Sequence, residues 1–397
     1  MVLLISDVPP TKKFSGSLLT YHLLKNISPD EFYGYYLVNP DLKSVGSEYP
    51  SELFQKKDIF RQKSRETSKR PSWLLFRPLK HIYSFLNELR RRYFEIPEYI
   101  HQIRKIIEEK KIDKVWIIIQ GQTMIWIAEK LIKMGYPVYV QMWDHPNWWI
   151  KANNFDFFSK RMLKRSYEFC LQHCRAFASP SENMSKIYRS KYPQMSVPFY
   201  GVYPRSIENV PLKPTETFII GIAGQIYATD TFLKLIDALN IACWSIDGRR
   251  VEIHYWGNSS LPYQHPRIIP FGYVDQDHLA SHLQKCHILY CPYWFDRSYE
   301  EEAKTSFPSK LISYMNVSVP IFFHGPEYSS PVEMLRETKA AIVCTSAEPS
   351  VILMNLRKLF YQVDAGAMVQ EGLKLVRGPL GVDQLRENFS QFLGSQP

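Results

Sequence analysis

Short apolar runs alternate along this chain with longer amphipathic stretches, and this alternation limits the possible folds more than any other feature. In the first half, the apolar runs lie at 2–6, 32–38, 115–120, 138–143 and 175–179. Stretches with helical periodicity lie between them, at 16–26, 98–110, 123–134, 158–174 and 182–191. Strands that alternate with helices form parallel sheets covered by helices. The pattern therefore predicts an α/β fold built on parallel sheets.

The alternating pattern stops at a proline-rich stretch and then starts again. Four prolines lie in this stretch, at 198, 204, 211 and 214. A second series follows, with stretches at 218–223, 231–243, 251–256, 268–271, 276–286, 288–292, 307–316, 320–323, 341–344 and 350–363. A chain of 397 residues is also long for one core. We expect two open α/β domains, at 1–204 and 205–380, and a final helix within 381–397.

Composition excludes several classes of protein. A hydrophobic content of 45% is too high for a disordered chain. No run of about 18 uncharged apolar residues is present, so the sequence predicts no membrane-spanning helix. The first residues resemble a buried strand rather than a signal peptide, which predicts a cytoplasmic protein.

The net charge of +10 is concentrated in one segment. Residues 56–92 hold twelve Lys and Arg against three acids, Asp58, Glu66 and Glu88. Trp73 and Phe76 lie among these cations, a combination that favours peripheral docking on an anionic membrane face. A solvated helical face is the simpler alternative. Since nothing in the chain resembles a nucleic-acid-binding module, we expect no nucleic-acid partner.

The six cysteines include no CxxC pair. Cys170 and Cys174 lie four residues apart on a predicted helix, with His173 between them. A zinc site is one interpretation, but buried thiols are the more common one. The sequence therefore predicts no metal site.

The stretch 305–321 carries the clearest chemical signal. A loop turns into a helix near Pro308 and Ser309, and proline suits the first helical turn. Free N–H groups at a helix start, together with the charge of Lys310, suit a diphosphate. An ordinary helix start with a surface lysine is the alternative.

A series of short motifs runs along the chain: Asp7-Val-Pro-Pro10 with Phe14-Ser-Gly-Ser17, then Trp143-Asp-His-Pro146, Ala178-Ser-Pro-Ser-Glu182, Ile220-Gly-Ile-Ala-Gly-Gln225, Tyr255-Trp-Gly257, Phe271-Gly-Tyr-Val274 and the 305–321 block. Their order resembles that of retaining glycosyltransferases of the GT-B fold, especially family 4. That block aligns without gaps to the family signature. Its Phe-Pro-Ser-Lys-Leu core, at 307–311, is similar to a bacterial surface-polysaccharide subgroup.

The resemblance implies two Rossmann-like domains that face each other across a cleft, with the C-terminal helix returning to the first domain. The second domain would bind a nucleotide-sugar and the first a glycan or lipid-linked acceptor, at the inner face of the membrane. Transfer would retain anomeric configuration and need neither metal nor cofactor. The catalytic residues implied are Asp144, His145 and Lys310. The donor-binding residues implied are Gly16, Gly224, Gln225, Tyr273, Val274, Thr305, Ser306, Phe307, Pro308, Ser309 and Leu311.

The chain also departs from the family pattern. The two signature glutamates fall on Thr305 and Ser313, and Gln225 replaces the usual arginine. Lys310 would supply the lost positive charge, and an acid among residues 300–302 could reach the sugar. A non-catalytic subunit with this fold is therefore an alternative, as is an inverting transferase or an epimerase.

Overall fold

The computed structural model describes residues 1–11, 15–25, 27–38, 49–55, 77–153, 155–201, 216–361 and 364–394. The chain forms two compact units. Unit 1 comprises Met1–Phe199 with Arg386–Pro397, and unit 2 comprises Tyr200–Leu385. The sequence pattern placed the division between 204 and 205.

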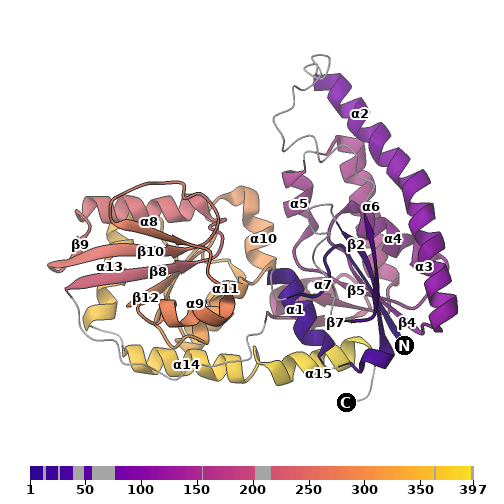
Figure 1. Cartoon of the computed structure of the whole chain (residues 1–397). Coiled ribbons are helices and arrows are strands. Elements are labelled where there is room, and N and C mark those ends of the chain that lie inside the picture. The colour runs from indigo at the N-terminus through magenta and orange to yellow at the C-terminus, as the bar shows by residue number, and fades with distance from the viewer. Residues whose placement is uncertain are drawn as a thin grey trace. The chain divides into compact units, whose positions relative to one another are not determined.

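A parallel sheet forms the centre of unit 1 (Figure 1). Within the described residues its strand order is β3-β2-β1-β4-β5-β6-β7. The strands are β1 (Val2–Ser6), β2 (Phe32–Val38), β3 (Ser51–Gln55), β4 (Lys114–Ile118), β5 (Val138–Gln141), β6 (Ala176–Ser179) and β7 (Met195–Pro198). The order changes direction between β1 and β4, which places the ends of these two strands at a topological switch point.

Alternate side chains of β4 supply the cores on the two faces of this sheet. Val115 and Ile117 belong to the large hydrophobic core, whereas Trp116 lies on the opposite face because successive side chains of a strand alternate. The helices of unit 1 are α1 (Ser15–Leu24), α2 (Arg77–Arg90), a π-helical segment (Arg91–Glu95), α3 (Ile96–Lys110), α4 (Gln122–Lys133), α5 (Pro146–Ala152), α6 (Phe157–His173) and α7 (Glu182–Arg189), with a 3-10 turn at Pro29–Glu31.

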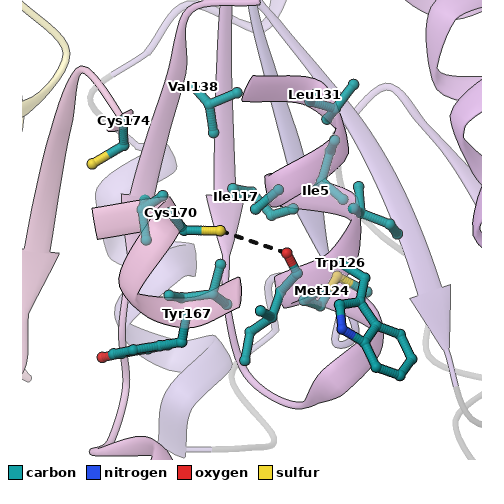
Figure 2. Packing of buried hydrophobic residues seen from close by; sticks show 14 of the residues in the cluster. Ile5, Ile117, Met124, Trp126, Leu131, Val138, Tyr167, Cys170 and Cys174 are labelled. Carbon is teal, nitrogen blue, oxygen red and sulfur yellow. Dashed lines mark hydrogen bonds between the residues drawn. The ribbon is translucent and has the colours of Figure 1, made fainter. Parts of the chain in front are cut away.

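The cysteines of α6 are buried core residues (Figure 2). The Cys170 thiol donates a hydrogen bond to the Ile125 carbonyl at 3.6 Å. Burial raises the pKa of Cys170, and it raises the pKa of Cys174 to about 12. The prediction of buried thiols is thus confirmed. Across the described ranges, no group of three His, Cys, Asp or Glu side chains could hold a metal ion.

Unit 2 repeats the parallel architecture (Figure 1). Its strand order is β11-β10-β8-β12-β13-β14, and the short β9 pairs antiparallel with β10. The strands are β8 (Thr217–Ala223), β9 (Ser245–Ile246), β10 (Arg249–Trp256), β11 (Ile268–Gly272), β12 (Ile288–Pro292), β13 (Ile321–His324) and β14 (Ile342–Cys344). Alternate residues of β8 enter two cores, Ile220 and Ile222 on one face and Ala223 on the other. Such two-sided burial is typical of a parallel sheet.

The helices of unit 2 follow its strands. They are α8 (Thr229–Ile241), α9 (Gln276–Leu283), α10 (Glu300–Thr305), α11 (Ser309–Met315), α12 (Ser330–Thr338), α13 (Pro349–Tyr361) and α14 (Ala365–Arg377), with a 3-10 turn at Arg297–Tyr299. In the part of the chain that is described, no helix is both long enough and apolar enough to cross a bilayer.

The last helix, α15 (Val382–Phe392), returns the chain to unit 1. The Phe389 and Phe392 rings lie 5.0 and 6.4 Å from the Trp116 ring, measured between centroids. Asn388 donates a side-chain hydrogen bond to the Pro198 carbonyl at 2.9 Å, and Lys114 donates one to the Leu393 carbonyl at 2.6 Å. The predicted return of the C-terminal helix to the first domain is confirmed.

We expect Phe392→Ala to lower the unfolding free energy of unit 1 by about 3–5 kcal/mol, because its fully buried ring would leave a cavity. Chemical denaturation followed by tryptophan fluorescence measures the effect. Phe157→Ala is the matched control: its ring is 70% exposed, so the change should stay within about 0.5 kcal/mol. Equal losses in the two variants would show that α15 does not anchor unit 1.

Candidate functional site

The sheet of unit 2 changes direction at β8, which pairs with β10 on one side and β12 on the other. Loops that leave the carboxyl ends of such strands diverge, and ligands bind in the crevice that results. Gly224 opens the loop after β8 with a φ of +74°, and no atom lies within 4 Å of where its Cβ would be. Only glycine adopts this conformation without strain, and it leaves the backbone open to a ligand.

Lys310 reaches this loop from α11. Its side chain is buried, and its Nζ donates a hydrogen bond to the Gln225 carbonyl at 2.8 Å. The same Nζ lies 5.0 Å from the centroid of the Tyr227 ring, a cation–π distance. Two segments far apart in the sequence, both predicted to bind the donor, therefore meet at the switch point.

Burial changes the acid–base chemistry of Lys310. Desolvation lowers the pKa of its ammonium to about 8, with a smaller opposing effect from Cys291. Among the described residues no carboxylate forms an ion pair with it. A largely protonated, poorly solvated ammonium beside an open glycine loop is suited to bind an anion.

Two tyrosines position the backbone around Lys310. The Tyr314 hydroxyl accepts a hydrogen bond from the Ala223 amide at 2.8 Å, which fixes the end of β8 against α11. The Tyr293 hydroxyl donates to the Ser306 carbonyl at 2.8 Å. Ser330 donates to the same carbonyl. These bonds hold the loop that enters α11 against β12 and α12.

The residues at the two glutamate positions of the family signature bond to their own helices. The Thr305 hydroxyl donates to the Glu301 carbonyl at 2.7 Å, and the Ser313 hydroxyl donates to the Lys310 carbonyl at 2.8 Å. Neither side chain carries the charge that the signature glutamates would bring to a sugar or a ribose.

The other predicted donor-binding residues of this stretch, at 307–309 and 311, pack against neighbouring parts of unit 2 or begin helix α11. The Phe307 ring packs edge-on against Tyr200 at 5.1 Å. Pro308 is the residue before the first turn of α11, and a Cβ at Gly201 would lie 3.3 Å from the Ser309 Cβ. Leu311 is fully buried in the core of unit 2, so it supports α11 and presents no surface to a ligand.

The acids at 300–302 differ from one another in environment. Glu300 forms an ion pair with Lys304 at 2.5 Å, and this neighbour lowers the pKa of the Glu300 carboxyl. Glu301 is exposed, whereas Glu302 is buried within α10. The predicted sugar contact by one of these acids stays a prediction.

The predicted donor-binding residues Tyr273 and Val274 follow β11 at the same edge of the sheet. Tyr273 is 54% exposed, and Val274 packs against the core. The exposed Phe271 ring stacks on Trp256 at 5.1 Å with an interplanar angle of 11°. Because β8, β10 and β11 are parallel neighbours, their carboxyl ends share one edge of the sheet. This edge presents exposed aromatic rings near the glycine loop.

In unit 1, Asp144 and His145 lie between the end of β5 and the start of α5. His145 is buried, and its Nδ1 accepts a hydrogen bond from the Asn147 amide at 3.3 Å. Asp144 and Trp143 are half-buried. The carboxyl end of β5 thus holds a histidine of fixed orientation beside an acid.

Three further residues from the predicted motifs of unit 1 are Trp148, Trp149 and Gly16. Trp149 is buried and packs edge-on against Phe155 at 5.9 Å, so it is a core residue. The side chain of Trp148 lies outside the described residues. Gly16 lies in the first turn of α1, the helix that follows β1.

The sequence analysis missed three tyrosines of this site. Tyr227 lies against the Lys310 ammonium, while Tyr293 and Tyr314 position the loops. Tyr227 stands two residues after Gln225, but nothing in the spacing marked it. Tyr314 follows Lys310 by one helical turn, a spacing that could have placed the two on neighbouring parts of one helix face.

No protein family matches the sequence, and neither does any curated protein. Solved structures do match over nearly the whole chain. Sucrose-phosphate synthase from Thermosynechococcus elongatus is 10% identical, with a TM-score of 0.65 and 98% of each chain covered. The α,α-trehalose-phosphate synthase (UDP-forming) from Burkholderia xenovorans is 10% identical, with a TM-score of 0.64 and 100% of each chain covered. The calicheamicin glycosyltransferase CalG4 has a TM-score of 0.54 at 9% identity, with 99% of this chain and 98% of that one covered. The chain therefore has the GT-B fold, as predicted.

We expect Tyr314→Phe to lower the stability of unit 2 by about 1–3 kcal/mol, because the buried Ala223 amide would lose its acceptor. Thermal and denaturant unfolding measure the loss. Tyr263→Phe is the control, since the Tyr263 hydroxyl makes only a 3.4 Å contact with Asn240 at the surface. Unchanged stability in Tyr314→Phe would contradict the positioning role.

Proposed function

We propose that this chain is a glycosyltransferase that moves a sugar from a nucleotide-sugar donor to an acceptor. The observation that carries the proposal is the buried Lys310 ammonium, which lies beside the open loop at Gly224 and Gln225. Among the solved structures of the same fold, one from E. coli is described as bound with UDP-2-fluoro glucose, and one from Burkholderia xenovorans as in complex with glucose-6-phosphate. These ligands support a donor and an acceptor site in this chain.

Lys310 would stabilise the leaving diphosphate. Departure of a nucleoside diphosphate from the sugar places negative charge on the phosphate oxygens, and a prepositioned cation in a poorly solvated site counters it. Since the usual arginine position holds Gln225, Lys310 is the cation that we assign to this role. The backbone at Gly224, with no side chain in the way, would let the phosphates approach.

Unit 1 would hold the acceptor. His145, with its ring fixed by the Asn147 amide, would contact the transferred sugar through its ring or its backbone carbonyl. Asp144 lies beside it at the end of β5. The donor phosphate itself would accept the proton of the acceptor hydroxyl, so the mechanism needs no dedicated protein base and no metal.

The proposal also covers the acceptor, the anomeric configuration of the product and the place of synthesis. We propose retention of anomeric configuration, a glycan or lipid-linked acceptor, and a role in surface-polysaccharide synthesis at the inner face of the membrane. The likeness of the 307–311 stretch to a surface-polysaccharide subgroup of family 4 supports this choice. Residues 56–76 of the predicted membrane segment lie outside the described residues.

We expect Lys310→Met to weaken the binding of the cognate nucleotide-sugar at least about tenfold, because the site loses its cation. Calorimetry against UDP, GDP, ADP and CMP sugars measures the affinity. In the unaltered protein the affinity should fall as the pH rises past about 8, since the neutral amine of Lys310 then replaces the ammonium.

Lys304→Met is the matched control, because Lys304 is an exposed lysine on the neighbouring helix α10. It should keep both the affinity and its pH profile. Full donor binding and transfer by Lys310→Met would contradict the proposal that Lys310 stabilises the leaving diphosphate. If no nucleotide-sugar binds the unaltered protein, the non-catalytic subunit becomes the better account.

We expect His145→Ala to keep the donor affinity and to lower the transfer rate by about tenfold or more. Its contact would be with the sugar during transfer and not with the nucleotide. The rate is measured with a radiolabelled donor, and the anomer of the product is assigned by NMR. His173→Ala, at an exposed histidine of the same unit, should leave the rate unchanged. Loss of donor binding in His145→Ala would contradict this division of roles.

A further inference from the structure

The helix formed by α2 and the π-helical segment buries two charged side chains and exposes several apolar ones. Its charged residues Glu88 and Arg91 are buried and form an ion pair at 2.6 Å. Four of its large apolar residues are exposed, whereas others are half-buried: Ile82 is 56% exposed, Leu86 57%, Tyr93 65% and Phe94 74%. Buried charge and exposed apolar side chains on one helix indicate that the outer face serves an interaction.

Two phenylalanines of α6 extend this apolar face. Phe157 is 70% exposed and Phe158 66% exposed, although both open the first turn of their helix. The Phe158 ring lies 5.6 Å from that of Phe85 on α2. We call the set of Ile82, Leu86, Tyr93, Phe94, Phe157 and Phe158 the aromatic face.

A hollow lies between the two elements that carry the aromatic face. It has a volume of about 530 Å³. Tyr93 and Phe158 line it together with Arg161 and Arg165 of α6. The Tyr93 and Phe158 rings and these arginines therefore line one surface, which Glu129 of α4 also lines.

Four cations of α6 are available for a partner, whereas the arginines at 90–92, which end the predicted basic segment, are paired with acids. Helix α6 contains Lys160, Arg161, Lys164 and Arg165, and its one acid is Glu168. Within the described ranges, none of these four side chains forms an ion pair. By contrast, Arg90 pairs with Glu95, Arg91 with Glu88 and Arg92 with Glu129.

We infer that the aromatic face docks on an anionic lipid bilayer, with its rings in the interfacial region and the α6 cations on the headgroups. Exposed aromatic and aliphatic side chains bordered by unpaired Lys and Arg are the pattern of an interfacial membrane contact. Four cations that form no ion pair within the described residues complement an anionic surface, which attracts Lys and Arg. A second copy of the chain would bring like charges together at this surface. The inference stands on the surface of unit 1 and does not depend on the proposed transfer reaction.

Co-sedimentation with vesicles tests the inference. The probes are vesicles of phosphatidylcholine alone and of phosphatidylcholine with an equal amount of phosphatidylglycerol. We expect the full chain to bind the anionic vesicles and not the neutral ones, and to be released by high salt. The variant with Lys164→Glu and Arg165→Glu should lose at least about tenfold in partitioning, because it reverses two unpaired charges. The variant with Phe157→Ser and Phe158→Ser should lose a similar factor through the apolar contact.

The matched control carries Lys191→Glu and Lys285→Glu, two exposed lysines outside α6, and so has the same net charge as the α6 variant. It should bind anionic vesicles as the unaltered protein does. Thermal unfolding and nucleotide-sugar affinity should be unchanged in all variants, which separates loss of docking from loss of fold or donor binding. Three outcomes would overturn the inference: equal binding to both vesicle types, equal losses in the control, or a dimer that dissociates in the phenylalanine variant.

Discussion

The parallel pairing of β8 with β10 on one side and β12 on the other decides where chemistry can occur in unit 2. Because the chain leaves β8 in one direction and β12 in the other, the loops after these strands separate and leave an open edge. Gly224 lies at this edge in a backbone conformation that favours glycine. The aromatic turn after β11 shares the edge, since a parallel sheet gathers all its carboxyl ends at one side.

Lys310 connects the loop at this edge to helix α11. The Gln225 carbonyl holds the Lys310 ammonium at 2.8 Å, and the surrounding burial lowers its pKa to about 8. A buried cation without a carboxylate partner costs free energy unless an anion joins it. This cost is the physical reason to assign Lys310 to an anionic ligand, and the tyrosines at 293 and 314 keep the loops around it in place.

In unit 1, the arginines at 90–92 form ion pairs within the fold. The high density of Lys and Arg up to Arg92 predicted a docking segment, but the three arginines at its end stabilise the helix through Glu95, Glu88 and Glu129. Within the described residues, four Lys and Arg side chains without an ion pair lie on α6, beside exposed rings. Local charge counts could not reveal this, because the partner of Arg92 lies on α4 and comes close only through folding.

The sequence by itself determined the α/β class, the central strands and the helices between them. Buried parallel strands are continuous apolar runs, and strands such as β1 and β8 lie where the pattern placed them. It missed β3, β7, α2, α5, α10, α12 and α14. The two strands among them are only five and four residues long and lie at the edges of the sheet. It also predicted Gly224, Gln225 and Lys310 as site residues, but not that Lys310 contacts the loop at 224–225. Only the tertiary structure decided that contact, and with it the tyrosines and the aromatic face, because hydrogen bonds and exposure depend on which distant segments the sheet brings together.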